Sequence, residues 1–187
     1  MRVVGGRLKG RQLVAPSSRD IRPTADRLRE SLFNILTHAY GDPVSDARVL
    51  DLFAGTGALG IEAVSRGAAF ALFVDTGAEA RALLRNNVES LGLGGVTKVY
   101  RRDAANLGPA HPMEPFSLVF LDPPYAKKLA EKALCSLRDG GWLTDGALLV
   151  VEEAKAAEFA APEGFEELER RSYDDTEFVF LRSVARP

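Results

Sequence analysis

Residues 48–60, Arg-Val-Leu-Asp-Leu-Phe-Ala-Gly-Thr-Gly-Ala-Leu-Gly, decide the fold class of this chain. The first six residues form a short apolar run of strand length, and glycines follow at positions 55, 57 and 60. Residues 58–66 then have the composition of a helix. A strand that leads through a glycine-rich turn into a helix is typical of the first unit of an α/β domain that binds a nucleotide-like ligand.

The segments around this unit repeat the same order. Apolar runs of strand length alternate with helical segments as far as residue 152, and two alternating strands around a turn at 173–176 follow. This βαβα order predicts an α/β fold with a doubly wound, mostly parallel sheet that helices cover on both faces, and an antiparallel hairpin at its end. The predicted strands are 48–53, 69–75, 96–101, 116–121, 147–152, 165–172 and 177–182, and the predicted helices are 58–66, 79–91 and 127–138.

Residues 1–40 predict a small extension in front of the main domain. Two short runs, 3–8 and 10–13, are separated by glycine and predict a β-hairpin. A helix with apolar residues at helical spacing is predicted to begin at Thr24, a residue type that caps helix N-termini, and a Gly-Asp-Pro sequence ends it. We therefore expect an extension of residues 1–40 and a main domain of residues 41–187.

Composition restricts the classes of protein that the chain can belong to. Hydrophobic residues make up 46% of its 187 residues, and its apolar runs are too short to cross a bilayer, so we expect no membrane contact. A single cysteine, together with the lack of an apolar signal segment, indicates the cytoplasm. We expect a monomer, because no amphipathic stripe is left over once the core is assigned.

The charge is unevenly distributed along the chain. The formal net charge is −2, yet residues 1–40 carry eight basic and three acidic residues, whereas residues 151–187 carry ten acidic and five basic ones. A basic arm on a mildly acidic body favours contact with a phosphate backbone at one end of the molecule. On charge alone, a merely solvated surface explains the arginines equally well.

Acidic residues at strand ends indicate the class of cofactor. Asp75 lies 20 residues beyond Gly55, where it can accept hydrogen bonds from ribose hydroxyls, but a nicotinamide cofactor and S-adenosylmethionine both fit this spacing. Asp51 favours S-adenosylmethionine, because a carboxylate attracts its ammonium and sulfonium groups and repels a pyrophosphate. Asp103 is either an acceptor for the adenine amino group or a helix N-cap. The candidate cofactor residues are Asp51, Phe53, Ala54, Gly55, Gly57, Asp75, Thr76, Asp103 and Ala104.

The sequence Asp122-Pro123-Pro124-Tyr125 follows the predicted strand 116–121 and indicates the reaction. Consecutive prolines stiffen this loop, so that a carboxylate and carbonyls are held in place. Such acceptors can orient an exocyclic base amine for attack on a methyl carbon and stabilise the charge that grows on the nitrogen. Tyr125 can stack on the base. We expect Asp122, Pro123 and Tyr125 to be catalytic; the alternative is a rigid turn without a chemical role.

With these motifs the chain resembles the RsmD-type bacterial 16S ribosomal RNA guanine-N2 methyltransferases, within the class that carries an (Asp/Asn)-Pro-Pro-(Tyr/Phe) motif. The resemblance covers nearly the whole chain and rests on residues 2–11, 22–36, 51–60 and 122–125. It implies a seven-stranded Rossmann-like methyltransferase sheet with a reversed final strand, S-adenosylmethionine as methyl donor, and no metal.

The resemblance also implies the substrate, a guanine in an exposed loop of 16S ribosomal RNA within the small ribosomal subunit or an assembly intermediate. It implies that the basic arm contacts this RNA. The candidate RNA-contacting residues are Arg2, Arg7, Lys9, Arg11, Arg22, Arg27 and Arg29. Two positions depart from the pattern of the family: Asp75 replaces the usual glutamate, and Asp174 replaces a glycine that we expect in the final turn.

Four other functions remain as alternatives. A DNA adenine-N6 methyltransferase uses the same tetrapeptide but normally needs an added recognition region, for which the roughly 35 residues after the core strands leave little room. A protein glutamine methyltransferase resembles this class with asparagine at the first motif position. A nicotinamide-dependent reductase leaves Asp51, Asp122 and Tyr125 unexplained. A non-catalytic RNA-binding assembly factor would not need an intact tetrapeptide.

Overall fold

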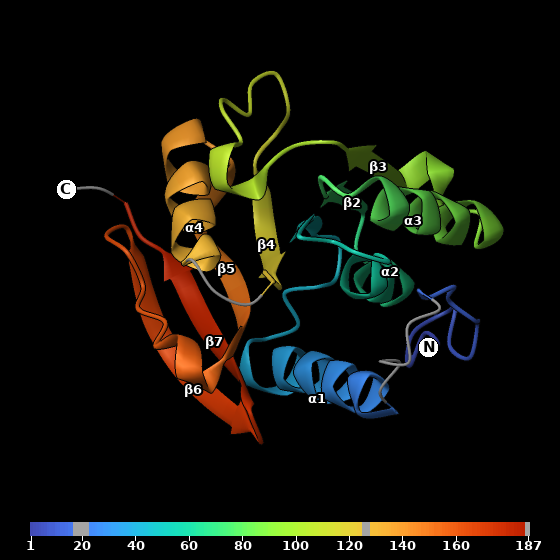
Figure 1. The fold of residues 1–187 in the computed structure, drawn as a ribbon. Coiled ribbons are helices and arrows are strands. Elements are labelled where there is room, and N and C mark those ends of the chain that lie inside the picture. The colour runs from blue at the N-terminus through green and yellow to red at the C-terminus, as the bar shows by residue number, and fades with distance from the viewer. Residues whose placement is uncertain (17–22, 125–127, 186–187) are drawn as a thin grey trace.

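The computed structural model describes residues 1–16, 23–124 and 128–185, without the side chains of residues 23–25. It contains one seven-stranded sheet with the strand order β3-β2-β1-β4-β5-β7-β6 (Figure 1). The five strands from β3 to β5 are parallel, and β7 and β6 complete the sheet in antiparallel pairs. The strands are β1 Arg48–Leu52, β2 Phe70–Val74, β3 Thr97–Tyr100, β4 Phe116–Leu121, β5 Leu143–Ala154, β6 Phe165–Tyr173 and β7 Thr176–Ser183.

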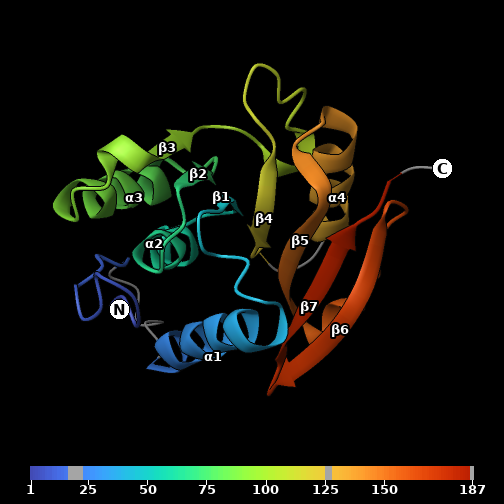
Figure 2. The same cartoon turned by 180° about the vertical axis from the view of Figure 1, so that it is seen from behind.

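Helices cover both faces of this sheet. Figures 1 and 2 show α1, α2 and α3 on one face and α4 on the other. Alternate residues of each strand enter two separate hydrophobic clusters: Val49 packs with the first three helices, whereas Leu50 packs with α4. The predicted doubly wound architecture is therefore confirmed. The helices are α1 Pro23–Ala39, α2 Ala58–Ser65, α3 Ala78–Ser90 and α4 Leu129–Gly140, with short 3₁₀ turns at Gly94–Val96, Ala104–Asn106 and Lys155–Ala157.

Most predicted boundaries lie within one residue of the observed ones, and two elements, β5 and α4, differ by more. β5 begins at Leu143, four residues before the predicted start, because Leu143 pairs with Phe116 ahead of a register irregularity in the β4–β5 ladder. α4 begins at Leu129 and ends at Gly140, where Gly141 adopts a left-handed conformation with φ 74°; the predicted first residue, Lys127, lies outside the described residues. None of the helices described is long and apolar enough to span a membrane.

The final hairpin keeps its shape without the expected glycine. Tyr173 pairs with Thr176, so that a two-residue turn connects β6 to β7. Asp174 has φ 51° in this turn. A left-handed residue is what tight hairpin turns require, and aspartate tolerates this conformation better than most residues. The substitution therefore leaves the turn in the conformation that a glycine would also adopt.

The predicted N-terminal β-hairpin is wrong in detail. Residues 1–13 form a loop that is closed by a single bridge between Arg2 and Gln12 rather than by two regular strands. The reason is that several amide groups of this loop donate to side chains of α2 instead of a strand partner. Val4 and Gly5 donate to the Glu62 carboxylate, and Leu8 donates to Ser65 Oγ.

The N-terminal segment packs into the main domain. Val3, Leu8 and Leu13 share a hydrophobic cluster with α1 and with the strands of the sheet. Asn87 of α3 connects the end of the segment to the glycine loop, because its amide bonds both Val14 and the Thr56 carbonyl. In Figures 1 and 2 the segment lies beside α2 and α1. Its position next to the glycine loop brings the basic arm close to the site described below.

Candidate active site

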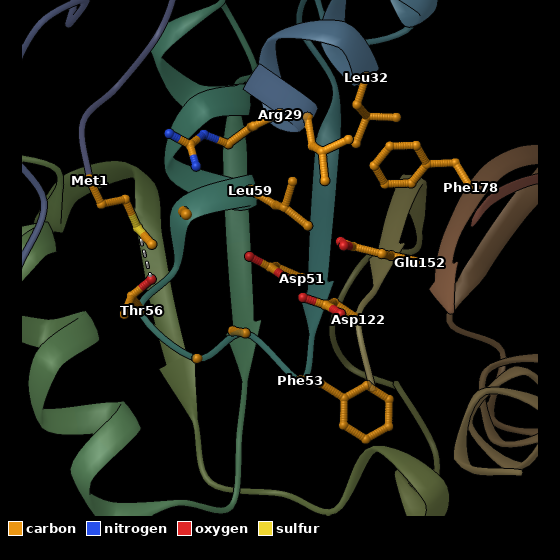
Figure 3. Close-up of a pocket in the computed structure, with 14 residues that line it drawn as sticks. Met1, Arg29, Leu32, Asp51, Phe53, Thr56, Leu59, Asp122, Glu152 and Phe178 are labelled. Carbon is orange, nitrogen blue, oxygen red and sulfur yellow. Dashed lines mark hydrogen bonds between the residues drawn. The ribbon is translucent and has the colours of Figure 1, made fainter. Parts of the chain in front are cut away.

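Three carboxylates from three neighbouring strands converge at the carboxyl edge of the sheet. Asp51 lies on β1, Asp122 directly follows β4, and Glu152 lies near the end of β5. Alternation along the strands points all three to the face covered by α1 and α2, since Val49, Phe120 and Val150 two residues earlier belong to the cluster on that face. Figure 3 shows the three side chains close together in the cavity. β1 and β4 are adjacent, so the site lies where the strand order reverses, which is where ligands bind in such sheets.

The carboxylates line a cavity of about 240 Å³ between the sheet, the glycine loop and α1. A second hollow of about 530 Å³ adjoins it and shares Phe53, Asp122 and Glu152 with it. Sites for small molecules have volumes of roughly 300–1,000 Å³. The two hollows together therefore offer room for a cofactor and part of a substrate.

Close packing explains two of the glycines in the loop. A Cβ atom on Gly57 would lie 2.2 Å from Leu84 Cδ1, and Gly57 itself has φ 83°. A Cβ atom on Gly60 would lie 2.4 Å from the ring of Phe73. Both glycines let α2 start directly against β2 and α3, which brings the loop backbone to the edge of the cavity.

Asp51 is a buried carboxylate with one backbone partner. It is 2% exposed, and its Oδ2 accepts a hydrogen bond of 3.0 Å from the Gly60 amide. Burial raises the pKa of Asp51 to about 8 against the lowering effect of that hydrogen bond, and the charge of Asp75 raises it further. A cation in the cavity would reverse this shift, because it favours the ionised carboxylate.

Asp75 holds the glycine loop from the neighbouring strand. Its two oxygens accept hydrogen bonds from the Gly55 amide at 2.9 Å and from the Gly77 amide at 2.7 Å. The carboxylate lines the second hollow together with Thr76. The shorter aspartate therefore reaches the loop, as well as the space where we expect a ribose.

Asp122 lies at the mouth of the cavity, where its side chain is accessible to solvent. The protein atoms crowded around its carboxyl raise its pKa well above the usual value, and the negative charges of Glu152, Asp51 and Glu153 raise it further. Pro123 is buried and lines the second hollow. Tyr125, the third predicted catalytic residue, lies outside the described residues.

The remaining predicted cofactor residues fall into two groups. Phe53, Ala54 and Gly55 line the central cavity, as predicted from the loop sequence. Asp103 instead caps the short 3₁₀ turn after β3, where its Oδ1 accepts a hydrogen bond of 2.9 Å from Ala105 N, and the neighbouring Ala104 is buried. Neither lines the two hollows, so the capping alternative is observed, while contact with an adenine stays a prediction.

The sequence reasoning missed the acidic end of β5. Glu152 lines both hollows and Glu153 lines the second one. Burial raises the pKa of both carboxyls. Their signal was present, because Glu152 and Glu153 follow an apolar strand in the same way as Asp122. Apolar residues of α1, α2 and β7 that also line the central cavity were missed as well: Leu28, Leu32, Leu59 and Phe178.

Most of the predicted RNA-contacting residues lie at the surface, with one exception. Arg29 is 5% exposed and pairs with Glu62 and Asp26, and it also donates to the carbonyl of Arg2. Its side chain runs away from the three cavity carboxylates (Figure 3). The expectation of a surface RNA contact for Arg29 is therefore wrong, because the guanidinium is used to hold the fold together. Arg22 lies outside the described residues, and the exposed candidates are Arg2, Arg7, Lys9, Arg11 and Arg27.

This site suits an organic cation. Asp51, Asp122 and Glu152 form no ion pair with any residue whose side chain the structure describes. The three carboxylates therefore fit the sulfonium and ammonium groups of S-adenosylmethionine and would repel the pyrophosphate of a nicotinamide cofactor. Within the described ranges no group of histidines, cysteines and acids has the arrangement of a metal site.

Comparison with known proteins agrees with this architecture. A family described as "Conserved hypothetical protein 95" matches residues 1–182. Ribosomal RNA small subunit methyltransferase D of Escherichia coli strain K12 is 41% identical over 152 residues, covering 81% of this chain and 74% of the relative. The Haemophilus influenzae protein of the same name is 33% identical over 174 residues, covering 92% and 88%. The solved structure of yhhF from Escherichia coli superposes with a TM-score of 0.83 at 33% identity, covering 100% of this chain and 99% of that one.

Proposed function

This chain belongs to the family described as "Conserved hypothetical protein 95", and from that premise we propose that it methylates the exocyclic N2 of a guanine in 16S ribosomal RNA, with S-adenosylmethionine as donor. The observation that carries the proposal is the convergence of Asp122 with Asp51 in one cavity beside the glycine loop. The first residue supplies an acceptor for an amine, and the second supplies negative charge for a cationic donor. The relatives named ribosomal RNA small subunit methyltransferase D support the choice of RNA.

Residues of the glycine loop and its neighbours would hold the cofactor. Asp51 faces the cavity. Burial disfavours ionisation of its carboxyl, and a cationic ligand would favour it. Asp75 and Thr76 border the second hollow, where they can bind a ribose. When bound, S-adenosylmethionine supplies a methyl carbon on a positively charged sulfur, which keeps the bonding electron pair and leaves as a neutral thioether.

Asp122 would orient the accepting amine and remove its proton. Its carboxylate accepts one N–H of the exocyclic amine, and the carbonyl of Pro123 can accept another, so that the nitrogen lone pair is aimed at the methyl carbon. The new N–C bond leaves the nitrogen with one proton too many, which the Asp122 carboxylate takes and passes to solvent at the cavity mouth. A raised pKa makes this carboxylate a stronger proton acceptor than an ordinary aspartate.

The exposed cations of the N-terminal segment would contact the RNA backbone. Arg2, Arg7, Lys9 and Arg11 lie on the loop that packs against α2, and Met1 of the same segment lines the cavity. Arg27 borders a surface hollow that shares Leu28 with the cavity. Cations around the mouth of an acidic pocket attract the phosphates while the pocket accepts the base. We further propose that the protein acts as a monomer in the cytoplasm on the small subunit or its assembly intermediate.

Methyl transfer to defined acceptors tests this function. The protein, incubated with tritiated S-adenosylmethionine, should label small ribosomal subunits or assembly intermediates that lack the modification more strongly than naked 16S RNA. Nuclease digestion and mass spectrometry should then locate one N2-methylguanosine. Labelling of DNA alone, or of adenine N6, would favour the adenine methyltransferase that shares the same tetrapeptide. Binding of NADH in preference to S-adenosylhomocysteine would contradict the proposed cofactor.

A further inference from the structure

Glu152 is a carboxylate of the cavity for which the proposed methyl transfer has no use. In the parallel register of β4 and β5, Leu121 pairs with Val151, so that Asp122 and Glu152 are the next residues of the two strands. Glu152 lines both hollows, and no hydrogen bond or ion pair joins its side chain to the side chains and backbone that the structure describes. Its oxygens are therefore free to bind a ligand next to Asp122.

Apolar side chains form a slot beside this carboxylate. Phe178 pairs with Glu152 across the β5–β7 ladder and belongs to the same cavity wall. Leu28 and Leu32 of α1 face the cavity as well, and Figure 3 shows Leu32 and Phe178 side by side next to Glu152. An aromatic ring and two leucines around a carboxylate make a site for a flat, largely apolar ligand that carries N–H donors at one edge.

Guanine has such an edge. Its Watson–Crick side presents an N1–H donor next to the N2 amino group, and one carboxylate can accept both in a bidentate pair, as it does from the two parallel N–H groups of an arginine. Adenine presents an N1 lone pair at the same place, which a carboxylate repels. An acid beside Asp122 therefore distinguishes the two purines whose amino groups this class of enzyme can methylate.

We propose that Glu152 reads the Watson–Crick edge of the target guanine by accepting hydrogen bonds from N1–H and from one N–H of the N2 amine, while the slot of Phe178, Leu28 and Leu32 holds the ring. This inference rests on the proposed function, because it assigns the base that enters the same cavity. The other N–H of the amine points to Asp122. Glu152 thus takes the place of the Pro123 carbonyl as the second acceptor, and two neighbouring acids share the two protons of the nitrogen. Glu152 selects the base and Asp122 assists the reaction.

Electrostatics supports this division of labour. Burial raises the pKa of Glu152 in the protein without ligands. Two N–H donors and a nearby cationic cofactor both favour the ionised form, so the carboxylate becomes a good acceptor when the cavity is filled. A glutamine at this position would present one acceptor and one donor, and its N–H₂ group would meet N1–H of guanine without a bond.

The test changes the hydrogen-bonding groups of residue 152 and of the base together, with Glu152→Gln in the protein and 2-aminopurine in place of guanine in the RNA. Glu152→Gln should lower kcat/KM for guanine in the small subunit roughly 10- to 100-fold, as expected for loss of a hydrogen bond to a charged group. S-adenosylhomocysteine should bind to Glu152→Gln as it does to the wild type. 2-Aminopurine keeps the N2 amine but has an N1 lone pair, which the glutamine amide can donate to. Reconstituted subunits with 2-aminopurine at the target position should therefore be a better substrate for Glu152→Gln than for the wild type.

Two further variants control the test. Glu152→Asp keeps the charge, so it should methylate more slowly than the wild type but keep the preference for guanine over 2-aminopurine. This variant tests the inference even if Glu152→Gln folds poorly. Glu166→Gln makes the same chemical change on the exposed side of β6 and should behave like the wild type. The inference is overturned if Glu152→Gln methylates guanine at the wild-type rate, if its preference between the two bases is unchanged, or if it loses S-adenosylhomocysteine binding. A wild-type protein that fails to methylate guanine would instead count against the proposed function.

Discussion

Glu62 of α2 and the acids of the cavity have opposite surroundings, although Glu62 and the cavity acid Asp51 are both buried. Glu62 of α2 is fully buried, accepts the amides of Val4 and Gly5 at 2.9 Å each, and pairs with Arg29 at 3.2 Å and Arg66 at 2.9 Å. At the carboxyl edge of the sheet, the cavity acids have no ion-pair partner among the described side chains, and Asp51 accepts one amide hydrogen bond from Gly60.

The difference separates a structural acid from a binding acid. The charge of the Glu62 carboxylate is compensated by groups that the fold itself supplies, so it needs no ligand. The cavity acids Asp51, Asp122 and Glu152 keep an uncompensated charge or bind a proton, and a cationic ligand relieves this. Removal of the Glu62 carboxylate should therefore lower stability. Removal of a cavity acid should lower activity or cofactor binding and leave stability unchanged or higher.

The largest effect is expected from Asp122→Ala. Methyl transfer should fall about 1,000-fold, because the variant loses both the acceptor that orients the amine and the base that takes its proton. Binding of S-adenosylhomocysteine, measured by calorimetry, should remain close to that of the wild type. Asp145→Ala removes an exposed aspartate from the start of β5 and serves as the control. Normal transfer by Asp122→Ala would contradict its assigned role.

Glu62→Gln should be the most destabilising of the acid substitutions. It leaves Arg29 with one fewer carboxylate partner in a buried position and weakens the anchor of the N-terminal segment, which should lower the free energy of unfolding by about 3–5 kcal/mol. Urea denaturation followed by circular dichroism measures this change. Glu89→Gln on the exposed side of α3 is the matched control. A loss for Glu62→Gln no larger than for the control would end the distinction between the two groups of acids.

Asp51→Asn should have the opposite sign. The folded-state pKa of Asp51 is about 8, far above that of an unfolded aspartate, so the folded protein binds the extra proton and loses stability as the pH rises from about 4 through 8. Asparagine removes this loss, so the ligand-free variant should gain several kcal/mol over the wild type at pH 9, at about 1.4 kcal/mol for each unit of pKa difference, and little at pH 4. Thermal unfolding at both pH values measures the gain. The same variant should bind S-adenosylmethionine more weakly, and tighter binding would contradict the cation site.

The smallest effect on the fold is expected from the exposed cations of the N-terminal segment. Replacement of Arg7, Lys9 and Arg11 by glutamine should leave the melting temperature nearly unchanged, because all three side chains are exposed and only an exposed hydrogen bond from Arg11 to the Ser90 carbonyl is lost. The slope of log affinity for RNA against log salt should decrease by about one for each phosphate that the arm no longer neutralises. Replacement of three exposed lysines elsewhere, Lys98, Lys132 and Lys155, provides the control. Equal slopes for both triple variants would mean that these residues do not contact RNA phosphates and are only a solvated surface.

Much of the site was predictable because its signals are local. Asp75 and Asp122 follow apolar runs and Asp51 lies near the end of one, and parallel strands bring such residues to a common edge. Glu152 obeys the same rule and could have been found by applying it to the fifth strand. Phe178 could not, because its place beside Glu152 depends on the antiparallel docking of β7, a contact between distant parts of the chain.

The errors arose where distant residues compete for the same groups. An arginine on a helix is usually exposed, yet Arg29 is buried because it pairs with Glu62, 33 residues later in the chain. The amides of residues 4, 5 and 8 were expected to form a hairpin, but side chains of α2 accept their hydrogen bonds. Neither partner is visible in a local pattern.

The sequence by itself determined the order of strands and helices, the glycine turn, and the acids at the strand ends, because strand periodicity and turn chemistry are properties of neighbouring residues. The tertiary structure alone decided which charges are neutralised and which remain available to a ligand. Pairing of charges depends on distances between residues far apart in the chain, and burial makes each such pairing, or its absence, energetically large.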